Sequence, residues 1–210
     1  NTRCIRSKFT NANGTSPEFG VDIEPNSGEY VDGAYFDHCE FSGNAGNGIS
    51  AFITHGSVSN IELNGCKSIN NGAVGFFGGV SVCRVTSSEF TGNGREGVWA
   101  QTLDDLTLSD CLIENNGLQT PSFTGAEVYI QSCLDAKLIG TRIRGGANVG
   151  RAVGGLFVSA NDGRSLDVLI SGCSVSGINS YGVSLQGAKL RATIKGSVIE
   201  DTASDCLASD

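Results

Sequence analysis

A short pattern of residues recurs along the whole chain and constrains its fold more than any other feature. Each copy holds two spaced apolar residues, a small residue or cysteine, another apolar residue, Asn/Gly turns, and an apolar segment that opens with glycine. Aligning the copies gives a column of small residues, namely Ser7, Cys39, Cys66, Ser88, Cys111, Thr141, Cys173 and Ser197. A second, mostly apolar column consists of Val21, Ile49, Phe76, Val98, Val128, Leu156, Val183 and Cys206. Without insertions the repeat is roughly 22 residues, enough for three short strands and three turns.

These repeats predict an all-β fold, a right-handed parallel β-helix solenoid of about eight coils with loop insertions. One coil cannot bury its own apolar face, so each coil needs neighbours above and below it. Equivalent residues of stacked parallel strands lie about 4.8 Å apart, which turns both columns into ladders. The 30 glycines supply the many tight turns. We expect one domain over residues 1–210, and because a repeat is already under way at the first residues, we expect a fragment of a longer chain.

The net charge and the cysteine content limit which partners and cofactors we expect. The net charge of −8 argues against nucleic acid, because phosphate binding needs clustered Lys and Arg. No apolar run is long enough for a transmembrane helix, so membrane insertion is not expected. The eight cysteines form no CxxC pair and there are only two histidines, so we expect no metal site and no cofactor.

The cysteines of the small-residue column have two interpretations. Neighbouring coils lie within disulfide distance, so Cys39 and Cys66 could pair. Parallel side-chain vectors are poor disulfide geometry, however, and serine fills the same position in other coils. We therefore expect free, buried thiols in a chain that is made in a reducing cytosol.

Strand alternation predicts a row of aromatic side chains on the outside of the solenoid. If Val21 and its equivalents point inward, the residues beside them point outward. The outward positions then include Phe77, Trp99, Gln101, Glu127, Tyr129 and Phe157. Such a row can bind a polysaccharide, because sugar rings pack their C–H faces on aromatic planes. It can equally be an oligomer interface, or be covered by the inserted loops.

Asp22 and Glu24 are the candidate catalytic pair. Residues two apart on a strand project from one face, roughly 6.5–7 Å apart at the backbone. Carboxyl groups about 6.5–9.5 Å apart suit an inverting glycosidase, and shorter separations suit a retaining one. The pair could also serve β-elimination from a uronic acid, or it could simply be solubilising. Glu127 lies four coils away, about 19 Å by stacking distance, so it cannot share a catalytic centre with Asp22.

The two histidines carry weaker hypotheses. His55 could act as a general base, although a histidine before a glycine turn is usually an exposed loop residue. His38 directly precedes a cysteine of the small-residue column, so we assign it to packing or to the turn.

The segment Gly-Val-Asp-Ile-Glu-Pro-Asn at 20–26, followed by Cys39-Glu-Phe41 and Asn44-Ala-Gly-Asn-Gly-Ile49, resembles the pectate-lyase-like β-helix superfamily. More narrowly, the chain is similar to bacteriophage tailspikes and mannuronan-epimerase-like β-helix proteins. The resemblance implies a carbohydrate-active protein. In tailspikes it implies a homotrimer on the virion tail, extracellular once assembled, that binds and cleaves a bacterial surface polysaccharide with outward carboxylates.

Only Asp22 and Glu24 match such a role residue by residue. The Asp-Pro-His motif of alginate epimerases and the calcium-binding aspartate clusters of pectate lyases are not found. Our first hypothesis is therefore a tailspike-type depolymerase, either a hydrolase or a lyase. The alternatives are a non-catalytic receptor-binding adhesin or stalk and, more weakly, an epimerase-like enzyme.

Overall fold

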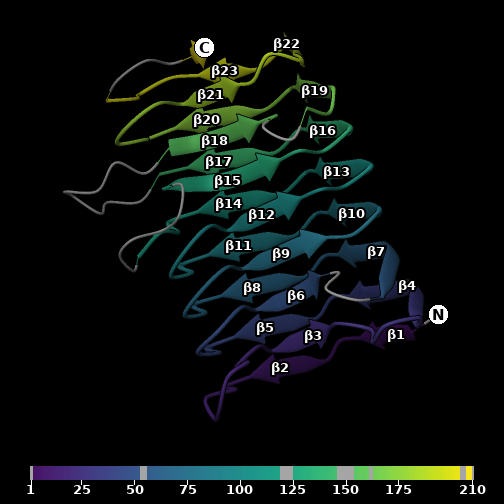
Figure 1. The fold of residues 1–210 in the computed structure, drawn as a ribbon. Coiled ribbons are helices and arrows are strands. Elements are labelled where there is room, and N and C mark those ends of the chain that lie inside the picture. Colours follow the sequence, from purple (N-terminus) through teal and green to yellow (C-terminus); the bar gives the residue numbers. More distant parts are fainter. Residues whose placement is uncertain are drawn as a thin grey trace.

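The computed structural model describes residues 2–52, 56–118, 125–145, 154–160, 163–203 and 207–209. These residues form three eight-stranded parallel sheets, which we name A, B and C. The chain passes from sheet A to sheet B to sheet C and then climbs to the next level, so one strand of each sheet makes up a rung (Figure 1). The eight rungs of the described chain confirm the predicted parallel β-helix of about eight coils.

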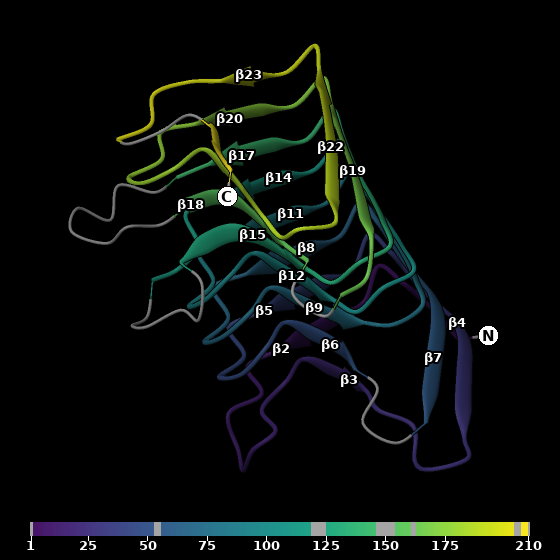
Figure 2. The ribbon, with the colours of Figure 1, turned by 45° about the horizontal axis from the view of Figure 1, so that its top comes forward.

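Sheet A is the sheet in which each rung begins. Its strands are, in spatial order, β1 (Thr2–Ile5), β4 (Tyr30–Asp37), β7 (Ser57–Asn64), β10 (Val82–Thr86), β13 (Asp105–Ser109), β16 (Asp135–Ile139), β19 (Leu166–Ser171) and β22 (Leu190–Lys195). The strands alternate inward apolar and outward polar residues, as in β10, where Cys83 and Val85 are buried and Arg84 is exposed. Figure 2 shows these strands side by side along one flank of the molecule.

Sheet B has the shortest strands. They are β2 (Lys8–Thr10), β5 (Glu40–Ser42), β8 (Lys67–Ile69), β11 (Glu89–Thr91), β14 (Leu112–Glu114), β17 (Arg142–Arg144), β20 (Ser174–Ser176) and β23 (Val198–Ile199). In the three-residue strands the middle residue points into the core, where Phe9 stacks on Phe41 with ring centroids 5.3 Å apart. Exposed ion pairs such as Lys8–Glu40 at 2.8 Å link the outer ends of neighbouring rungs.

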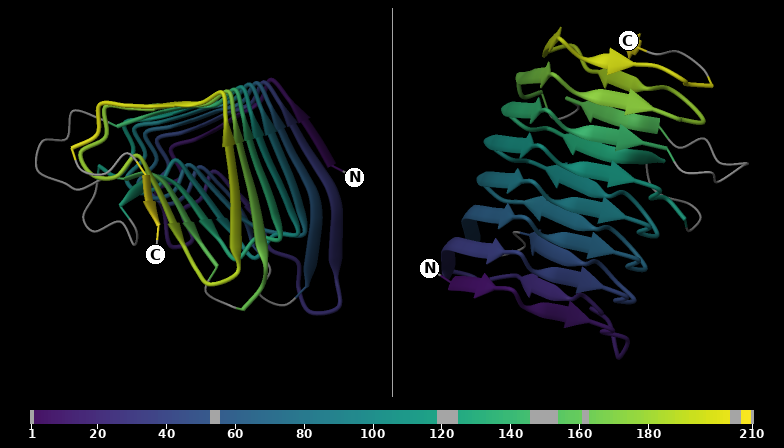
Figure 3. Two further views of the ribbon diagram at one scale, coloured as in Figure 1. Left: turned by 90° about the horizontal axis from the view of Figure 1, so that it is seen from above. Right: turned by 180° about the vertical axis from the view of Figure 1, so that it is seen from behind.

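Sheet C completes each rung. Its strands are β3 (Val21–Ile23), β6 (Ile49–Phe52), β9 (Phe76–Gly79), β12 (Val98–Gln101), β15 (Ala126–Gln131), β18 (Gly154–Ser159), β21 (Val183–Gln186) and β24 (Leu207–Ser209). The view along the axis in Figure 3 shows the three sheets enclosing one interior. Apolar side chains from all three sheets fill that interior as a continuous core.

The bend from sheet A to sheet B explains the column of small residues. At this bend every rung has one residue with positive φ, namely Arg6, His38, Gly65, Ser87, Asp110, Gly140, Gly172 and Gly196. The left-handed residue reverses the chain sharply, and the next residue is a buried Cys, Ser or Thr in the six central rungs. Their polar atoms find backbone partners, as where the Cys66 thiol donates to the Phe36 carbonyl at 3.2 Å. The predicted ladder is thus confirmed.

The seven described cysteines are free, as predicted. The predicted inward column of sheet C is confirmed from Val21 to Val183, but its last member was wrong by one residue. Leu207, not Cys206, pairs with Val183. The cause is that no glycine opens this strand, so the sequence lacks the mark that sets the register in other rungs. Cys206 itself lies outside the described residues.

A ladder of asparagines crosses the bend from sheet B to sheet C. Its members are Asn44, Asn71, Asn93 and Asn116. The side-chain oxygens of Asn71, Asn93 and Asn116 each accept hydrogen bonds from the backbone N–H and the Nδ2 of the asparagine one rung earlier, at 2.8–3.2 Å. Buried backbone N–H groups at the turn are thereby satisfied.

In the described part of the chain no helix is long and apolar enough to span a bilayer.

Candidate carbohydrate-binding faces

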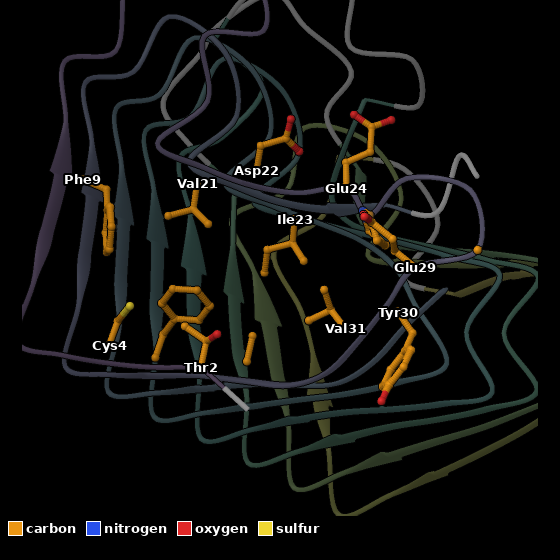
Figure 4. Close-up of a pocket in the computed structure, with 14 residues that line it drawn as sticks. Thr2, Cys4, Phe9, Val21, Asp22, Ile23, Glu24, Glu29, Tyr30 and Val31 are labelled. Carbon is orange, nitrogen blue, oxygen red and sulfur yellow. The ribbon is translucent and has the colours of Figure 1, made fainter. Parts of the chain in front are cut away.

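Asp22 and Glu24 project from the same side of the first rung, as the sequence predicted. Asp22 lies on β3 and Glu24 directly follows this strand, and both are exposed. Figure 4 shows their carboxylates pointing away from Val21 and Ile23, which turn toward the interior. Buried Pro25 follows Glu24 and ends the extended segment, because proline cannot donate a ladder hydrogen bond.

The two carboxyl groups help to line a hollow that the first two rungs form. The hollow has a volume of about 710 Å³ and is lined mainly by apolar residues that include Cys4, Phe9 and Val31. Partial burial, and then the nearby charge of Glu24, raise the pKa of Asp22 above its ordinary value. A raised pKa lets Asp22 hold a proton more readily than an ordinary aspartate does, which is the property that a general acid needs.

The predicted aromatic row is present on sheet C and is longer than the sequence indicated. We name it the aromatic strip, and it consists of Phe52, Phe77, Trp99, Tyr129, Phe157 and Tyr181. Successive ring centroids lie 5.1, 5.0, 5.6, 5.3 and 6.1 Å apart. Four of the six are aligned in register, since Phe77 pairs with Trp99, Trp99 with Tyr129, and Tyr129 with Phe157. The same column continues downward through Ser50 to Asp22.

The strip is only partly open to solvent. Phe77, Trp99, Phe157 and the neighbouring Gln101 are half-buried. The Arg95 guanidinium lies 5.0 Å from the centre of the Trp99 ring, a cation–π contact. The prediction of an exposed Tyr129 was wrong, because this residue is 3% exposed. Its ring is stacked between Trp99 and Phe157, so little of its face remains for a ligand.

Glu127 was predicted to face outward within the strip, and this placement was wrong. Its side chain is 0% exposed and points into the bend, where its carboxylate accepts hydrogen bonds from Asn116. Burial raises the pKa of Glu127 to about 8. A sugar cannot reach this carboxyl group, so it is not a substrate-binding residue.

The sequence held a signal for the burial of Glu127. Neighbouring rungs carry Gly48, Gly75 and Gly97 at the equivalent position before the sheet C strand. A Cβ on Gly97 would lie 2.6 Å from Asn116 Nδ2, so the asparagine ladder leaves no room there. Glu127 follows the last asparagine of the ladder, and its carboxylate takes the place of the next amide.

A second hollow, on the outer face of sheet A, was missed by the sequence analysis. It has a volume of about 600 Å³ and lies across the first four rungs. His38, which we assigned to packing or to the turn, stands beside it with Nδ1 3.0 Å from Asp37 Oδ1. The register of sheet A could have revealed the hollow, because it places charged and aromatic residues in one outward column.

His55 lies outside the described residues, so its role as a general base stays a prediction. The described part of the chain contains no cluster of three or more His, Cys, Asp or Glu side chains that could hold a metal ion.

The family model described as "Right handed beta helix region" matches residues 4–156 and 53–209. The chain therefore belongs to the right-handed β-helix family.

Among solved structures, the chain is similar to the A-module of the mannuronan C-5 epimerase AlgE6 from Azotobacter vinelandii. The TM-score is 0.70 at 20% sequence identity, over 92% of this chain and 52% of that module. At this identity the likeness shows the shared fold, and the chain spans about half of the module's length. No curated protein sequence matches the chain. Together, the family model and the solved structure show that the chain has the right-handed parallel β-helix fold.

Proposed function

We propose that this β-helix is a polysaccharide depolymerase that holds its substrate along sheet C and cleaves it with Asp22 and Glu24. One observation carries the proposal: the column that contains Asp22 continues through Ser50 into the stacked rings of Phe77 and Trp99. A sugar chain lying along this column would rest on aromatic edges and present a glycosidic bond to the carboxyl pair.

We assign the two roles from the raised pKa of Asp22. Asp22, with its raised pKa, donates a proton to the glycosidic oxygen that leaves. Glu24 takes a proton from a water molecule, whose oxygen attacks the anomeric carbon as the carbon–oxygen bond breaks. The products are a new reducing end and a new hydroxyl group. Exchange of protons with solvent then returns Asp22 to its acid form and Glu24 to its base form.

A panel of bacterial surface polysaccharides tests the proposal. Reducing ends are measured for the wild type, Asp22→Asn, Glu24→Gln and Glu200→Gln, the last an exposed control at the far end of the solenoid. We expect release by the wild type and the control and a loss of at least about a hundredfold in the first two variants. Equal release by all four proteins would contradict the assignment of the pair.

Product chemistry separates the reaction classes. Ultraviolet absorbance from a new carbon–carbon double bond indicates a lyase, and its absence from a cleaved product indicates a hydrolase. Epimerised sugar residues without cleavage, seen by NMR, would instead support the chemistry named for the similar solved structure.

Binding without cleavage is the second candidate function, that of an adhesin or stalk. It is favoured by the burial of Tyr129 and by the Arg95 guanidinium over Trp99, because both leave the strip more packed than open. Saturable binding of a polysaccharide with no product from any variant would support it.

The biological setting that we propose is a tailspike, a homotrimer on a virion tail. The support is the elongated solenoid with the aromatic strip along one flank, together with free thiols among the described cysteines that suit assembly in a reducing cytosol. Analytical ultracentrifugation tests the trimer directly, and a sedimenting monomer would contradict it.

A further inference from the structure

Six Asn-Gly pairs occur in the chain, and in this dipeptide an asparagine side chain is chemically least stable. The backbone nitrogen of the next residue can attack the side-chain amide, and glycine hinders the approach least because it has no Cβ. The pairs are Asn13-Gly14, Asn47-Gly48, Asn64-Gly65, Asn71-Gly72, Asn93-Gly94 and Asn116-Gly117. The fold places them in different surroundings, so their reactivity should differ as well.

Five of the pairs hold the attacking nitrogen in a hydrogen bond. Their glycine N–H groups donate to backbone carbonyls of a neighbouring rung at 2.7–3.0 Å, and these glycines are Gly48, Gly65, Gly72, Gly94 and Gly117. Attack requires this bond to open first, which costs free energy in the folded chain. In four of the pairs the asparagine is also buried, and Asn64 is the exception. Asn64 therefore separates the effect of exposure from the effect of the bonded N–H.

The pair Asn13-Gly14 differs from the other five. Both residues are exposed in the loop between β2 and β3. A Cβ placed on Gly14 would meet nothing within 4 Å, so the backbone here is open on all sides. Among the described residues, neither the Asn13 amide nor the Gly14 N–H has a hydrogen-bond partner. Nucleophile and amide can therefore meet without the loss of a native contact.

We propose that Asn13 is a site of spontaneous deamidation, at which its side-chain amide becomes a carboxylate. The Gly14 nitrogen attacks Asn13 Cγ, a carbon–nitrogen bond forms, and the bond from Cγ to Nδ2 breaks. Ammonia leaves with the proton of the Gly14 N–H, and a cyclic imide remains. A water molecule then opens the ring. Addition at Cγ gives aspartate, and addition at the main-chain carbonyl carbon gives isoaspartate.

The reaction changes the first rung between two anchors of its loop. Before the pair, the Ala12 N–H donates to Asn44 Oδ1 at 3.0 Å, and after it the Glu18 carbonyl accepts from the Gly46 N–H at 2.9 Å. The new charge and the longer isoaspartate backbone therefore stay within the exposed loop. At Asn71, by contrast, the same reaction would remove an Nδ2 donor that the buried ladder uses. The bonded glycines thus protect the asparagines on which the fold depends.

Ageing of the whole chain in mildly alkaline buffer tests the proposal, because base promotes loss of the Gly14 N–H proton. Peptide mass spectrometry follows each pair by the mass change from amide to acid, and enzymatic methylation detects isoaspartate. In the folded chain Asn13 should react at least about tenfold faster than Asn64 and at least about a hundredfold faster than Asn71. In urea the rates of all six pairs should converge, because the hydrogen bonds of the fold are lost.

Gly14→Ala is the matched variant, since its added methyl group hinders the attack but has open space in the fold. It should slow the reaction at Asn13 about tenfold and leave the rate at Asn64 unchanged. Equal thermal unfolding of the variant and the wild type shows that the fold is kept.

Four outcomes would overturn the proposal. The first is an Asn13 that stays intact in the folded chain while it reacts in urea. The second is an equal rate at Asn13 and Asn64 in the folded chain, which would mean that exposure alone sets the rate. The others are an unchanged rate at Asn13 in Gly14→Ala, and aspartate without isoaspartate as the product.

Discussion

Glu127 closes the asparagine ladder by accepting hydrogen bonds from Asn116. The Asn116 backbone N–H lies 3.2 Å from each carboxylate oxygen, and Asn116 Nδ2 lies 2.6 Å from Oε2. Burial is the main cause that raises the pKa of Glu127 to about 8, and the charge of Glu114 adds to it, while the bonds from Asn116 act in the opposite direction. A carboxyl group thus continues a structural series made of amides.

The raised pKa of Glu127 predicts a loss of stability with rising pH. Below its ordinary value near 4.5 the carboxyl is protonated in both the folded and the unfolded chain. Between about 4.5 and 8 the unfolded chain loses this proton while the folded chain keeps it, so the free energy of unfolding falls. Relative to the wild type, Glu127→Gln should gain stability over this window, by on the order of a few kcal/mol. Urea unfolding at several pH values measures the difference, and a difference that does not change with pH would contradict it.

The asparagine ladder lies so close to sheet C that any side chain at position 97 should destabilise the fold. A Cβ there would lie 2.6 Å from Asn116 Nδ2 and 2.6 Å from Ile113 Cγ2, and both groups are buried. Gly97→Ala should lower the free energy of unfolding by about 1–3 kcal/mol. Gly14→Ala is the matched control, because nothing lies within 4 Å of its added Cβ. Chemical unfolding of both variants checks the pair, and equal stabilities would be inconsistent with the packing described.

The different burial of the thiols predicts that the cysteines react with an alkylating reagent at different rates. Burial raises the pKa of Cys66 and Cys111 to about 11, which leaves almost no thiolate at neutral pH. Cys4, on the edge strand of the first rung, is the least buried of the seven described cysteines. Among these seven, iodoacetamide should therefore alkylate Cys4 first in the native protein, and should alkylate the buried cysteines after unfolding without a reductant. Peptide mass spectrometry gives the order, and a cysteine that reacts only after reduction would reveal a disulfide.

The repeat made the fold predictable because each rung places the same kinds of residue at the same bend. Cys66, Ser88 and Cys111 fill one position because only a small side chain fits after a left-handed residue. The single register error, Cys206 for Leu207, arose in the rung that lacks the opening glycine.

The candidate site was less predictable, because strand alternation predicts which side of the sheet a side chain faces but not whether neighbouring side chains bury it. Strand alternation correctly predicted that Asp22 and Trp99 point away from the core. It could not show that neighbouring rings bury Tyr129, or that Glu127 turns into the bend to replace an amide. The hollow on the outer face of sheet A depends on the alignment of Arg3, Tyr35 and Arg84 across rungs, which becomes clear only once the register of sheet A is known.

The most direct test of the central claim is the emission of Trp99 during titration with a polysaccharide that the chain cleaves. The Asp22→Asn variant is used, so that the substrate stays intact while it binds. If the polysaccharide lies along the aromatic strip, the emission of this single tryptophan changes and saturates at the concentration at which calorimetry shows binding. Calorimetric binding with no change in Trp99 emission would contradict the claim that sheet C holds the substrate.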